Sequence, residues 1–266
     1  MNDFRAGLGF EDVFLVTLDA LRYDVAQKAW QDGETPYLAR LLPSAGWELR
    51  HSPGSFTLPS HLAFFAGFLP TPAAPGRHER PWALRFAGSK STGPETLVFD
   101  APHIVAGYAA HGYHTLCIGS TGFFNERTAL GRVLPAHFAE SHWNPSFGVA
   151  DPRSAENQFR FVAQRLRELP STQRVFLFVN VGATHPPTRV YVPGARTESP
   201  ETQAAALRYV DSRLPVLVEA LRERGRWRGI ICSDHGTCHG EDGYEGHRLA
   251  HPLVWAVPYA EVEIMP

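Results

Sequence analysis

Two apolar runs each end in an aspartate, and this pairing constrains the fold more than any other feature of the sequence. Residues 13–18 (VFLVTL) stop at Asp19, and residues 229–233 (GIICS) lead to Asp234. Near-continuous apolar runs are typical of parallel strands covered by helices on both faces, and ligands of such sheets collect at the carboxyl ends of the strands. We therefore expect Asp19 and Asp234 to meet at one sheet edge.

The residues after the second run point to a metal site. Asp234 is followed directly by His235 and Gly236. A carboxylate oxygen and an imidazole nitrogen that are adjacent in sequence, with a glycine to turn the backbone, can converge on one divalent cation. An ordinary Asp-His-Gly turn is the alternative explanation of these three residues.

Thr57 is predicted to lie just before a helix. Pro59 suits a first helical position, and the apolar stretch 62–66 follows it. The amino end of a helix stabilises negative charge, so a hydroxyl there, especially one bound to a metal, can lose its proton and attack an electrophile. A simple capping threonine is the commoner role and remains the alternative.

Strand and helix patterns alternate along the chain without an internal repeat. They predict an α/β fold, a three-layer sandwich whose largely parallel central sheet is flanked by helices, as one domain over residues 1–266. Strands are expected near 13–18, 46–51, 114–119, 175–181 and 228–233, and helices near 35–42, 59–67, 100–111, 152–168 and 201–224.

Several segments, in a fixed order, resemble the alkaline phosphatase superfamily. Within it the chain is similar to the sulfatase-like branch that includes phosphoethanolamine transferases and lipoteichoic acid synthases, and the resemblance spans nearly the whole chain. It implies an alkaline phosphatase-like fold. The matching segments are LDALRYD (18–24), TPYLARL (35–41), SFTLPSH (55–61), ATHPP (183–187), LRYVD (207–211) and DHG (234–236).

The departures from the family pattern bear on the chemistry. Sulfatases carry a cysteine or serine that becomes formylglycine, followed by a proline and an arginine; here Thr57 occupies the first place and His61 the last. Because threonine cannot become formylglycine, the resemblance implies direct attack by Thr57 on phosphorus. Ala20 stands where sulfatases have a second acidic residue, which indicates one calcium ligand fewer and a softer metal such as zinc or manganese.

The resemblance also implies a ligand set for one tightly bound divalent metal: Asp19, Thr57, Asp234 and His235. A second ion is left open. Two-metal relatives add an aspartate and a histidine four residues apart, whereas Asp211 is followed by no such histidine.

Three further histidines are candidates for catalysis. His185 follows a predicted strand, where relatives place a histidine that contacts the transferred group, and His247 and His251 lie in the loop after the Asp-His pair. His251 is favoured by its position before Pro252, with His247 as its competitor; either can protonate a leaving oxygen or complete a second metal site. For a lone histidine, a solvated or capping role is the alternative.

We also expect His185, His61 and Arg22 to contact the substrate. Residues 70–98, rich in proline, glycine and arginine, are predicted to form a loop over the active-site face. We hypothesise that an arginine of this loop reaches an anionic substrate; the candidates are Arg77, Arg80 and Arg85.

Composition narrows the class of partner. The formal net charge is -2, which argues against a nucleic-acid-binding surface. Hydrophobic residues make up 44% of the chain, which is typical of a soluble globular protein. No run reaches the length of a membrane helix, and the amino terminus lacks a signal-like pattern, so we expect a cytoplasmic protein without membrane contact. The three cysteines have no zinc-finger spacing and are interpreted as buried thiols.

Together these features predict a metal-dependent hydrolase. It would cleave a phosphate or related ester of a small anionic molecule through a covalent intermediate on Thr57. Phosphotransfer or phosphomutase activity with the same chemistry is one alternative, and a non-catalytic metal-binding protein that retains the fold is another. Oligomeric state and the natural substrate are left open.

Overall fold

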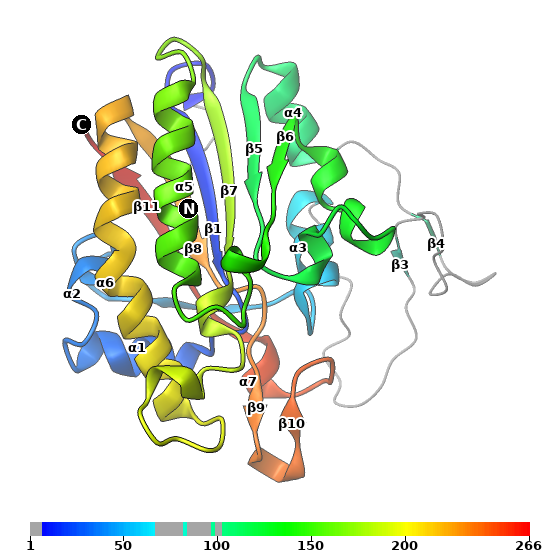
Figure 1. Cartoon of the computed structure of the whole chain (residues 1–266), viewed down its shortest axis with the longest axis vertical. Helices are drawn as coiled ribbons and strands as arrows, with labels where there is room; N and C mark the ends of the chain where they lie inside the picture. Colours follow the sequence, from blue (N-terminus) through cyan, green and yellow to red (C-terminus); the bar gives the residue numbers. More distant parts are fainter. Residues whose placement is uncertain (1–6, 67–81, 84–96, 99–102) are drawn as a thin grey trace.

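The architecture is a seven-stranded sheet between two layers of helices, seen in a computed structural model that describes residues 7–66, 82–83, 97–98 and 103–266 (Figure 1). The five strands from β8 to β6 pair in parallel, and β11 is antiparallel to both of its neighbours. This confirms the predicted largely parallel α/β sandwich. In sheet order the strands are β2 (Glu48–His51), β11 (Ala256–Ile264), β8 (Trp227–Cys232), β1 (Asp12–Leu18), β7 (Val175–Val181), β5 (His114–Ile118) and β6 (Glu140–His142).

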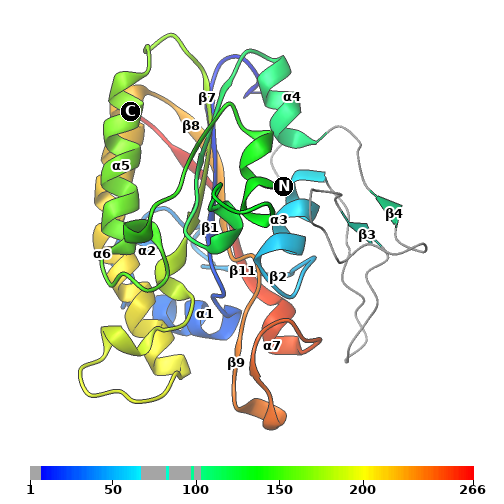
Figure 2. The same cartoon turned by 45° about the vertical axis from the view of Figure 1, so that its right-hand side comes forward.

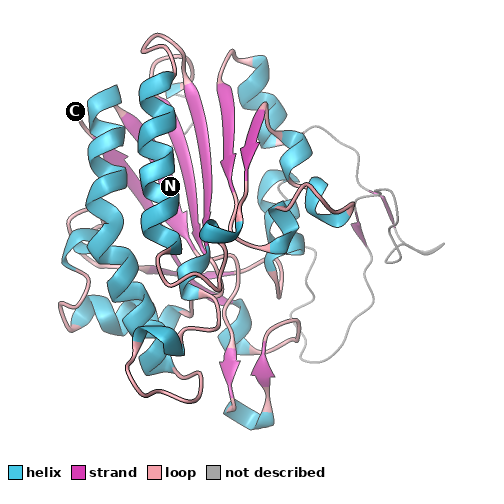
Figure 3. Cartoon of the chain, viewed as in Figure 1, coloured by secondary structure: helices cyan, strands magenta, loops and turns pink. Residues whose placement is uncertain are grey.

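Helices cover both faces of this sheet. Turned by 45°, the structure shows α5 and α6 on one face and α3 and α4 on the other (Figure 2). A small hairpin of β9 (Cys238–His239) and β10 (Glu245–Gly246) projects beyond the carboxyl ends of the parallel strands (Figure 3). A separate parallel pair joins β3 (Trp82–Ala83) to β4 (Leu97–Val98). The helices are α1 (Tyr23–Gln31), α2 (Pro36–Ala39), α3 (Thr57–Ala66), α4 (Ile104–Ala110), α5 (Ser154–Glu168), α6 (Pro200–Arg224) and α7 (Pro252–Trp255).

Strand β7 contributes apolar side chains to both faces of the sheet, which explains why helices cover both faces. Its side chains alternate between the faces, as side chains of a strand must. Val175, Leu177 and Val179 pack in the core formed with α5 and α6, whereas Phe176 and Phe178 pack in the core formed with α3 and α4. All seven residues of β7 are buried, and all but Asn180 are apolar, so the strand is a nearly continuous apolar run.

The structure differs from the predicted elements in two ways: some helices begin or end at other residues, and some elements were not predicted. Helix α3 begins at Thr57, two residues earlier than expected, and α2 ends at Ala39 rather than near residue 42. Helix α1 and strands β6 and β11 were not predicted. Because β11 is antiparallel and shows partial alternation, with Glu261 and Glu263 less buried than their neighbours, it lacks the continuous apolar signal of β1 and β7.

Within the described ranges, no helix combines the length and the apolarity needed to cross a membrane. The arginines proposed to reach the substrate from the 70–98 loop, Arg77, Arg80 and Arg85, lie outside the described residues.

Candidate metal centre and nucleophile

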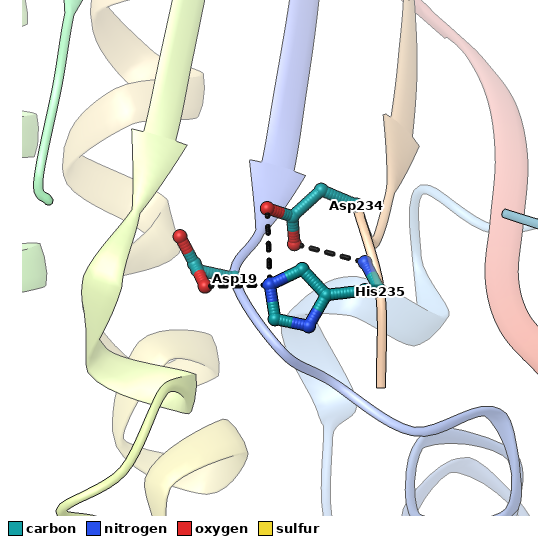
Figure 4. A group of neighbouring side chains, drawn as sticks. All are labelled: Asp19, Asp234 and His235. Carbon is teal, nitrogen blue, oxygen red and sulfur yellow. Dashed lines mark hydrogen bonds and ion pairs between the residues drawn. The ribbon is translucent and has the colours of Figure 1, made fainter. Parts of the chain in front are cut away.

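The two predicted aspartates meet where β1 and β8 end. These strands pair in parallel, with Thr17 opposite Cys232, so the residues that follow them emerge at the same sheet edge. Asp19, Asp234 and His235 converge there from two different strand ends (Figure 4). All three side chains are fully buried. The prediction that Asp19 and Asp234 lie together is confirmed.

Backbone groups fix the orientation of these side chains. The Asp234 Oδ1 atom accepts hydrogen bonds from the backbone N–H groups of Ala20 and His235, each at 3.1 Å. The His235 Nδ1 atom lies 2.8 Å from the carbonyl oxygen of Gly236, to which it donates. The His235 Nε2 atom then faces the carboxylates, 3.5 Å from Asp19 Oδ1 and 3.6 Å from Asp234 Oδ2.

These three facing atoms suit a metal ion. Asp19 Oδ1, Asp234 Oδ2 and His235 Nε2 are buried and have no hydrogen-bond partner among the described residues. Leaving buried polar atoms unpaired is costly, so such a cluster needs an explanation. Ligand atoms about 2.1 Å from a tetrahedral zinc ion lie about 3.4 Å from one another, close to the observed separations. The residues present therefore fit a divalent cation with oxygen and nitrogen ligands.

Without a cation the site is electrostatically unfavourable. Burial and the adjacent Asp19 carboxylate raise the pKa of Asp234 well above its usual value. Burial opposes ionisation of Asp19 too, but His185, His235 and a hydrogen bond from Asn180 bring its pKa below the usual value. Burial lowers the pKa of His235 to about 4, which leaves its imidazole neutral and able to bind a metal at neutral pH.

Thr57 joins this group from α3. It is the first residue of the helix, is 2% exposed, and its hydroxyl donates to Asp19 Oδ2 at 3.4 Å. Pro59 lies in the first turn, where a missing N–H leaves no helical hydrogen bond unmade. The hydroxyl thus lies at the amino end of a helix and beside the buried carboxylates, as the nucleophile prediction requires.

His185 and His247 border the same group. The ring centroid of His247 lies 4.6 Å from that of His235 and 5.2 Å from that of His185. Burial lowers the pKa of His247 to about 3, and the nearby His235 and His185 contribute to this shift. The His247 Nδ1 atom is buried without a hydrogen-bond partner among the described residues.

His251 has other partners. Its Nδ1 atom accepts a hydrogen bond from the Leu253 N–H and thereby caps α7, and its Nε2 atom lies 3.1 Å from Asp242 Oδ2. Of the two competing histidines, the structure brings His247, rather than the favoured His251, to the carboxylate group.

The structure does not place His61 where the predicted substrate contact would need it. Its side chain is fully buried and is surrounded by phenylalanine rings at centroid distances between 5.2 and 6.2 Å. Its Nδ1 atom lies 2.6 Å from the Thr57 carbonyl oxygen and its Nε2 atom 3.0 Å from the Thr17 hydroxyl. Burial lowers its pKa to about 4, so the imidazole is neutral. The packing of an apolar helix face around it could not be seen in the motif alone.

Arg22 is also engaged elsewhere. It is 4% exposed, and its guanidinium forms ion pairs with Asp24, at 2.5 Å, and with Glu241. These two carboxylates neutralise its charge, so the structure does not support the predicted substrate contact. Arg22 instead ties the end of β1 to the β9–β10 hairpin.

Asp211 does not contribute to a second metal site. It lies in α6, and its carboxylate accepts hydrogen bonds from the backbone N–H groups of Leu38, at 2.7 Å, and Tyr37, at 3.3 Å, at the start of α2. Among the described residues, Asp19, Asp234 and His235 form the one cluster of three or more metal-ligating side chains.

Sequence reasoning missed Arg248. This exposed residue has a left-handed backbone, with φ of 70°, and its N–H donates to the Ser55 carbonyl oxygen at 2.8 Å. Its guanidinium lies 5.0 Å from the centre of the Phe56 ring, and its charge lowers the pKa of His247, second to the effects of burial and the other histidines. Only its position next to His247 could have drawn attention to it.

A family model matches most of the chain. The family model described as Sulfatase matches residues 11–260. A comparison with curated protein sequences finds no match.

Solved structures share the fold at low sequence identity. One is the C-terminal periplasmic domain of phosphoethanolamine transferase EptC from Campylobacter jejuni, with 15% identity, a TM-score of 0.61 and coverage of 95% of this chain and 79% of that chain. Another is the corresponding domain of EcEptC from Escherichia coli in complex with zinc, with 11% identity, a TM-score of 0.61 and coverage of 95% and 72%. The lipoteichoic acid synthase LtaP from Listeria monocytogenes matches with 12% identity, a TM-score of 0.61 and coverage of 97% and 66%.

The family match covers the strands that carry Asp19 and Asp234 as well as the helix that carries Thr57. A further structure that shares the fold is titled as a protein in the alkaline phosphatase superfamily from Vibrio parahaemolyticus, with 16% identity, a TM-score of 0.60 and coverage of 96% of this chain and 61% of that chain. The chain therefore belongs to the Sulfatase family.

Proposed function

We propose that this protein is a metal-dependent phosphoesterase that uses Thr57 as its nucleophile. Family membership indicates an enzyme that acts on sulfate or phosphate esters. The observation that carries the finer proposal is the Thr57 hydroxyl, which donates a hydrogen bond to Asp19. It lies beside buried atoms of Asp234 and His235 that have no hydrogen-bond partner within the part of the chain that the structure describes. A threonine cannot be converted to formylglycine, which favours phosphate over sulfate esters.

The proposed metal ligands are Asp19, Thr57, Asp234 and His235. A bound divalent ion supplies acidification of an adjacent hydroxyl and stabilisation of negative charge on the phosphoryl oxygens. Zinc or manganese suits this mixed oxygen and nitrogen set, and the similar E. coli domain was solved in complex with zinc. We propose one tightly held ion, because Asp211 is occupied with the start of α2.

In the proposed reaction, four side chains have separate roles. The Thr57 hydroxyl gives up its proton towards Asp19, and its Oγ atom forms a bond to phosphorus while the ester P–O bond breaks. His185 gives a proton to the departing oxygen and later takes one from the water that releases the phosphoryl group. His247 remains neutral and donates a hydrogen bond to a phosphoryl oxygen, which stabilises the developing charge.

Among the described residues, Arg248 is a cation placed to attract an anionic ester. Its guanidinium rests on Phe56, next to the segment that carries Thr57, and its backbone follows His247 directly. We therefore propose a small anionic ester as the substrate. A cytoplasmic location, without nucleic-acid or membrane contact, stays a prediction from the sequence.

Phosphotransfer is a second candidate. It is favoured by the similarity to structures titled as phosphoethanolamine transferases and as a lipoteichoic acid synthase. Transfer and hydrolysis differ only in whether an alcohol or water releases the group from Thr57. Adding increasing concentrations of a simple alcohol separates them, because a transferase converts part of its product into a new phosphate ester.

The function is tested with a panel of chromogenic esters. Metal-stripped protein is reloaded with zinc, manganese, magnesium or calcium and offered a phosphate monoester, a phosphodiester and a sulfate ester. We expect turnover of a phosphate ester with zinc or manganese, and a loss of kcat of about 10³-fold or more in Thr57→Ala. Thr115→Ala, which removes a fully buried hydroxyl in β5, is the matched control. Equal rates for Thr57→Ala and the wild type would contradict the proposal.

A further inference from the structure

His61 occupies a position whose chemistry the proposed reaction does not use. It lies one helical turn after Thr57 in α3, and the rings of Phe64, Phe65, Phe124 and Phe178 enclose it. A neutral imidazole in such surroundings is costly unless both of its ring nitrogens have hydrogen-bond partners. Both ring nitrogens of His61 have a hydrogen-bond partner, and these partners connect His61 to the candidate metal centre.

The direction of each hydrogen bond follows from the chemistry of its partner. The Thr57 carbonyl oxygen can only accept, so the Nδ1 atom of His61, 2.6 Å away, carries the hydrogen. The Nε2 atom of the neutral ring is then an acceptor, and the Thr17 hydroxyl donates to it at 3.0 Å. Thr17 lies in β1, two residues before Asp19. His61 therefore joins the nucleophile's helix to the strand that carries a metal ligand.

The chain of hydrogen bonds continues through Asn180 in β7. Its Nδ2 atom donates both to the Thr17 hydroxyl oxygen, at 3.1 Å, and to Asp19 Oδ2, at 3.0 Å. The Ser120 hydroxyl donates to Asn180 Oδ1 at 2.5 Å. Because an ionised carboxylate can only accept, the Nδ2 end of the amide faces Asp19. All four of these side chains are buried, at 2% exposure or less.

The hydrogen bond from the Thr57 hydroxyl to Asp19 completes a closed series of hydrogen bonds, because the series also starts at Thr57. Asp19 Oδ2 accepts from the Thr57 hydroxyl as well as from Asn180, so this oxygen is held by two donors. The other oxygen, Oδ1, has no hydrogen-bond partner among the described residues and faces His235 Nε2. The arrangement selects which Asp19 oxygen is available to a cation.

We propose that His61 is a positioning residue, which acts through a closed hydrogen-bond circuit of Thr57, His61, Thr17, Asn180 and Asp19. The circuit holds the Asp19 carboxylate so that Oδ1 is presented to the cation, and it holds the Thr57 hydroxyl next to that carboxylate. This inference rests on the proposed function only in taking the cluster as a metal site. Side chains that orient metal ligands commonly change metal affinity by about 10–100-fold when they are replaced.

The test is zinc affinity, measured by competition with a chromogenic chelator. Thr17→Val keeps the shape of the side chain but removes the hydroxyl that links His61 to Asn180. We expect its zinc dissociation constant to rise by about 10–100-fold. Thr115→Val is the matched control, because Thr115 is a fully buried strand threonine whose hydroxyl accepts a hydrogen bond from the Ala139 N–H. This hydroxyl is not part of the circuit, so we expect the zinc dissociation constant to change by less than about 2-fold.

Two further variants keep the test decisive if Thr17→Val folds poorly. His61→Asn retains a donor near the Thr57 carbonyl but cannot reach Thr17, so zinc should bind about 10-fold more weakly. Ser120→Ala releases the Asn180 amide and should weaken binding in the same direction. The Thr17→Val/His61→Asn double variant should bind zinc no more weakly than the worse single variant, because both break the same circuit.

The outcomes separate this inference from the proposed function. Folded variants that bind zinc as tightly as the wild type would overturn the circuit, even if the wild type hydrolyses phosphate esters. Weakened zinc binding in the variants, together with no hydrolysis of any ester by the wild type, would support the circuit and contradict the proposed reaction. A wild type that binds no zinc, manganese, magnesium or calcium would overturn both.

Discussion

Asp234→Asn is expected to stabilise the metal-free protein while it abolishes tight zinc binding. The Asp234 carboxylate is fully buried, and its ligand atom lies within 4.8 Å of those of Asp19 and His235. Its Oδ1 atom accepts from two backbone N–H groups, and an asparagine oxygen can keep both of these bonds. The substitution thus removes a negative charge from a repelling pair without removing the hydrogen bonds that orient the side chain.

The size of the effect follows from the separation. Two unit charges within 4.8 Å of each other repel by about 3.5 kcal/mol at an effective dielectric constant of about 20. Proton uptake by one carboxylate relieves part of this repulsion, so we expect Asp234→Asn to raise the free energy of unfolding of the metal-free protein by about 1–3 kcal/mol. For a chain of 266 residues, that corresponds to a rise in Tm of about 2–5 °C.

The pH dependence has a definite sign. The pKa of Asp234 is raised in the folded protein by burial and by Asp19, so the folded state holds this proton more tightly than the unfolded state does. The associated stability is present below the unfolded pKa of about 3.9 and is lost as the pH rises towards the folded pKa. The advantage of Asp234→Asn in chelator should therefore grow between about pH 4 and neutral pH.

The assay is thermal unfolding in a chelator and in zinc, at about pH 5 and about pH 7.5. Zinc at 100 times its dissociation constant should stabilise the wild type by about 2.7 kcal/mol and the variant by much less. Asp211→Asn is the control: Asp211 is also buried and accepts from two backbone N–H groups, but it uses both oxygens to do so and should be destabilised by the change. A metal-free Asp234→Asn protein no more stable than the wild type at neutral pH would refute the reasoning.

Three further predictions concern the histidines and the arginine beside the candidate site, and the glycine that follows His235. His185→Gln and His247→Gln should each lower kcat by about 10²-fold or more and leave the zinc dissociation constant within a few-fold, which steady-state kinetics and chelator competition would show. Arg248→Ala should raise KM for anionic esters by about 10-fold with little change in kcat, because its charge is proposed to attract the substrate before the reaction; an unchanged KM would remove Arg248 from the site. Gly236→Ala should cost about 3 kcal/mol or more and yield little folded protein in an expression trial, since an added Cβ would lie 1.9 Å from the Leu253 carbonyl oxygen.

The sequence predicted those parts of the fold that rest on strong local patterns. The mainly apolar runs within β1, β7 and β8, and the Asp residues that follow β1 and β8, were enough to place Asp19 and Asp234 together. Parallel strands expose their carboxyl ends at the same sheet edge, so this inference needs no knowledge of side-chain packing.

What sequence reasoning missed depends on contacts between distant segments. His61 was expected to face the substrate because of its place in the motif, but α3 packs it among phenylalanine rings that come from three parts of the chain. Arg22 was expected to do the same, but it is neutralised by Glu241, which is 219 positions away in sequence. No local pattern records a partner so remote. The roles of Thr57, His185 and His247 in catalysis stay predictions.

The most direct test of the central claim is mass spectrometry of the zinc-loaded protein, quenched in acid during turnover of a phosphate ester. A phosphothreonine is stable in acid, so a covalent intermediate should be preserved and can be assigned to a peptide. The account predicts one phosphoryl group on Thr57, absent from Thr57→Ala and retained in the Thr115→Ala control. A phosphoryl group on another residue, or turnover without any modification of Thr57, would contradict the assignment of Thr57 as the nucleophile.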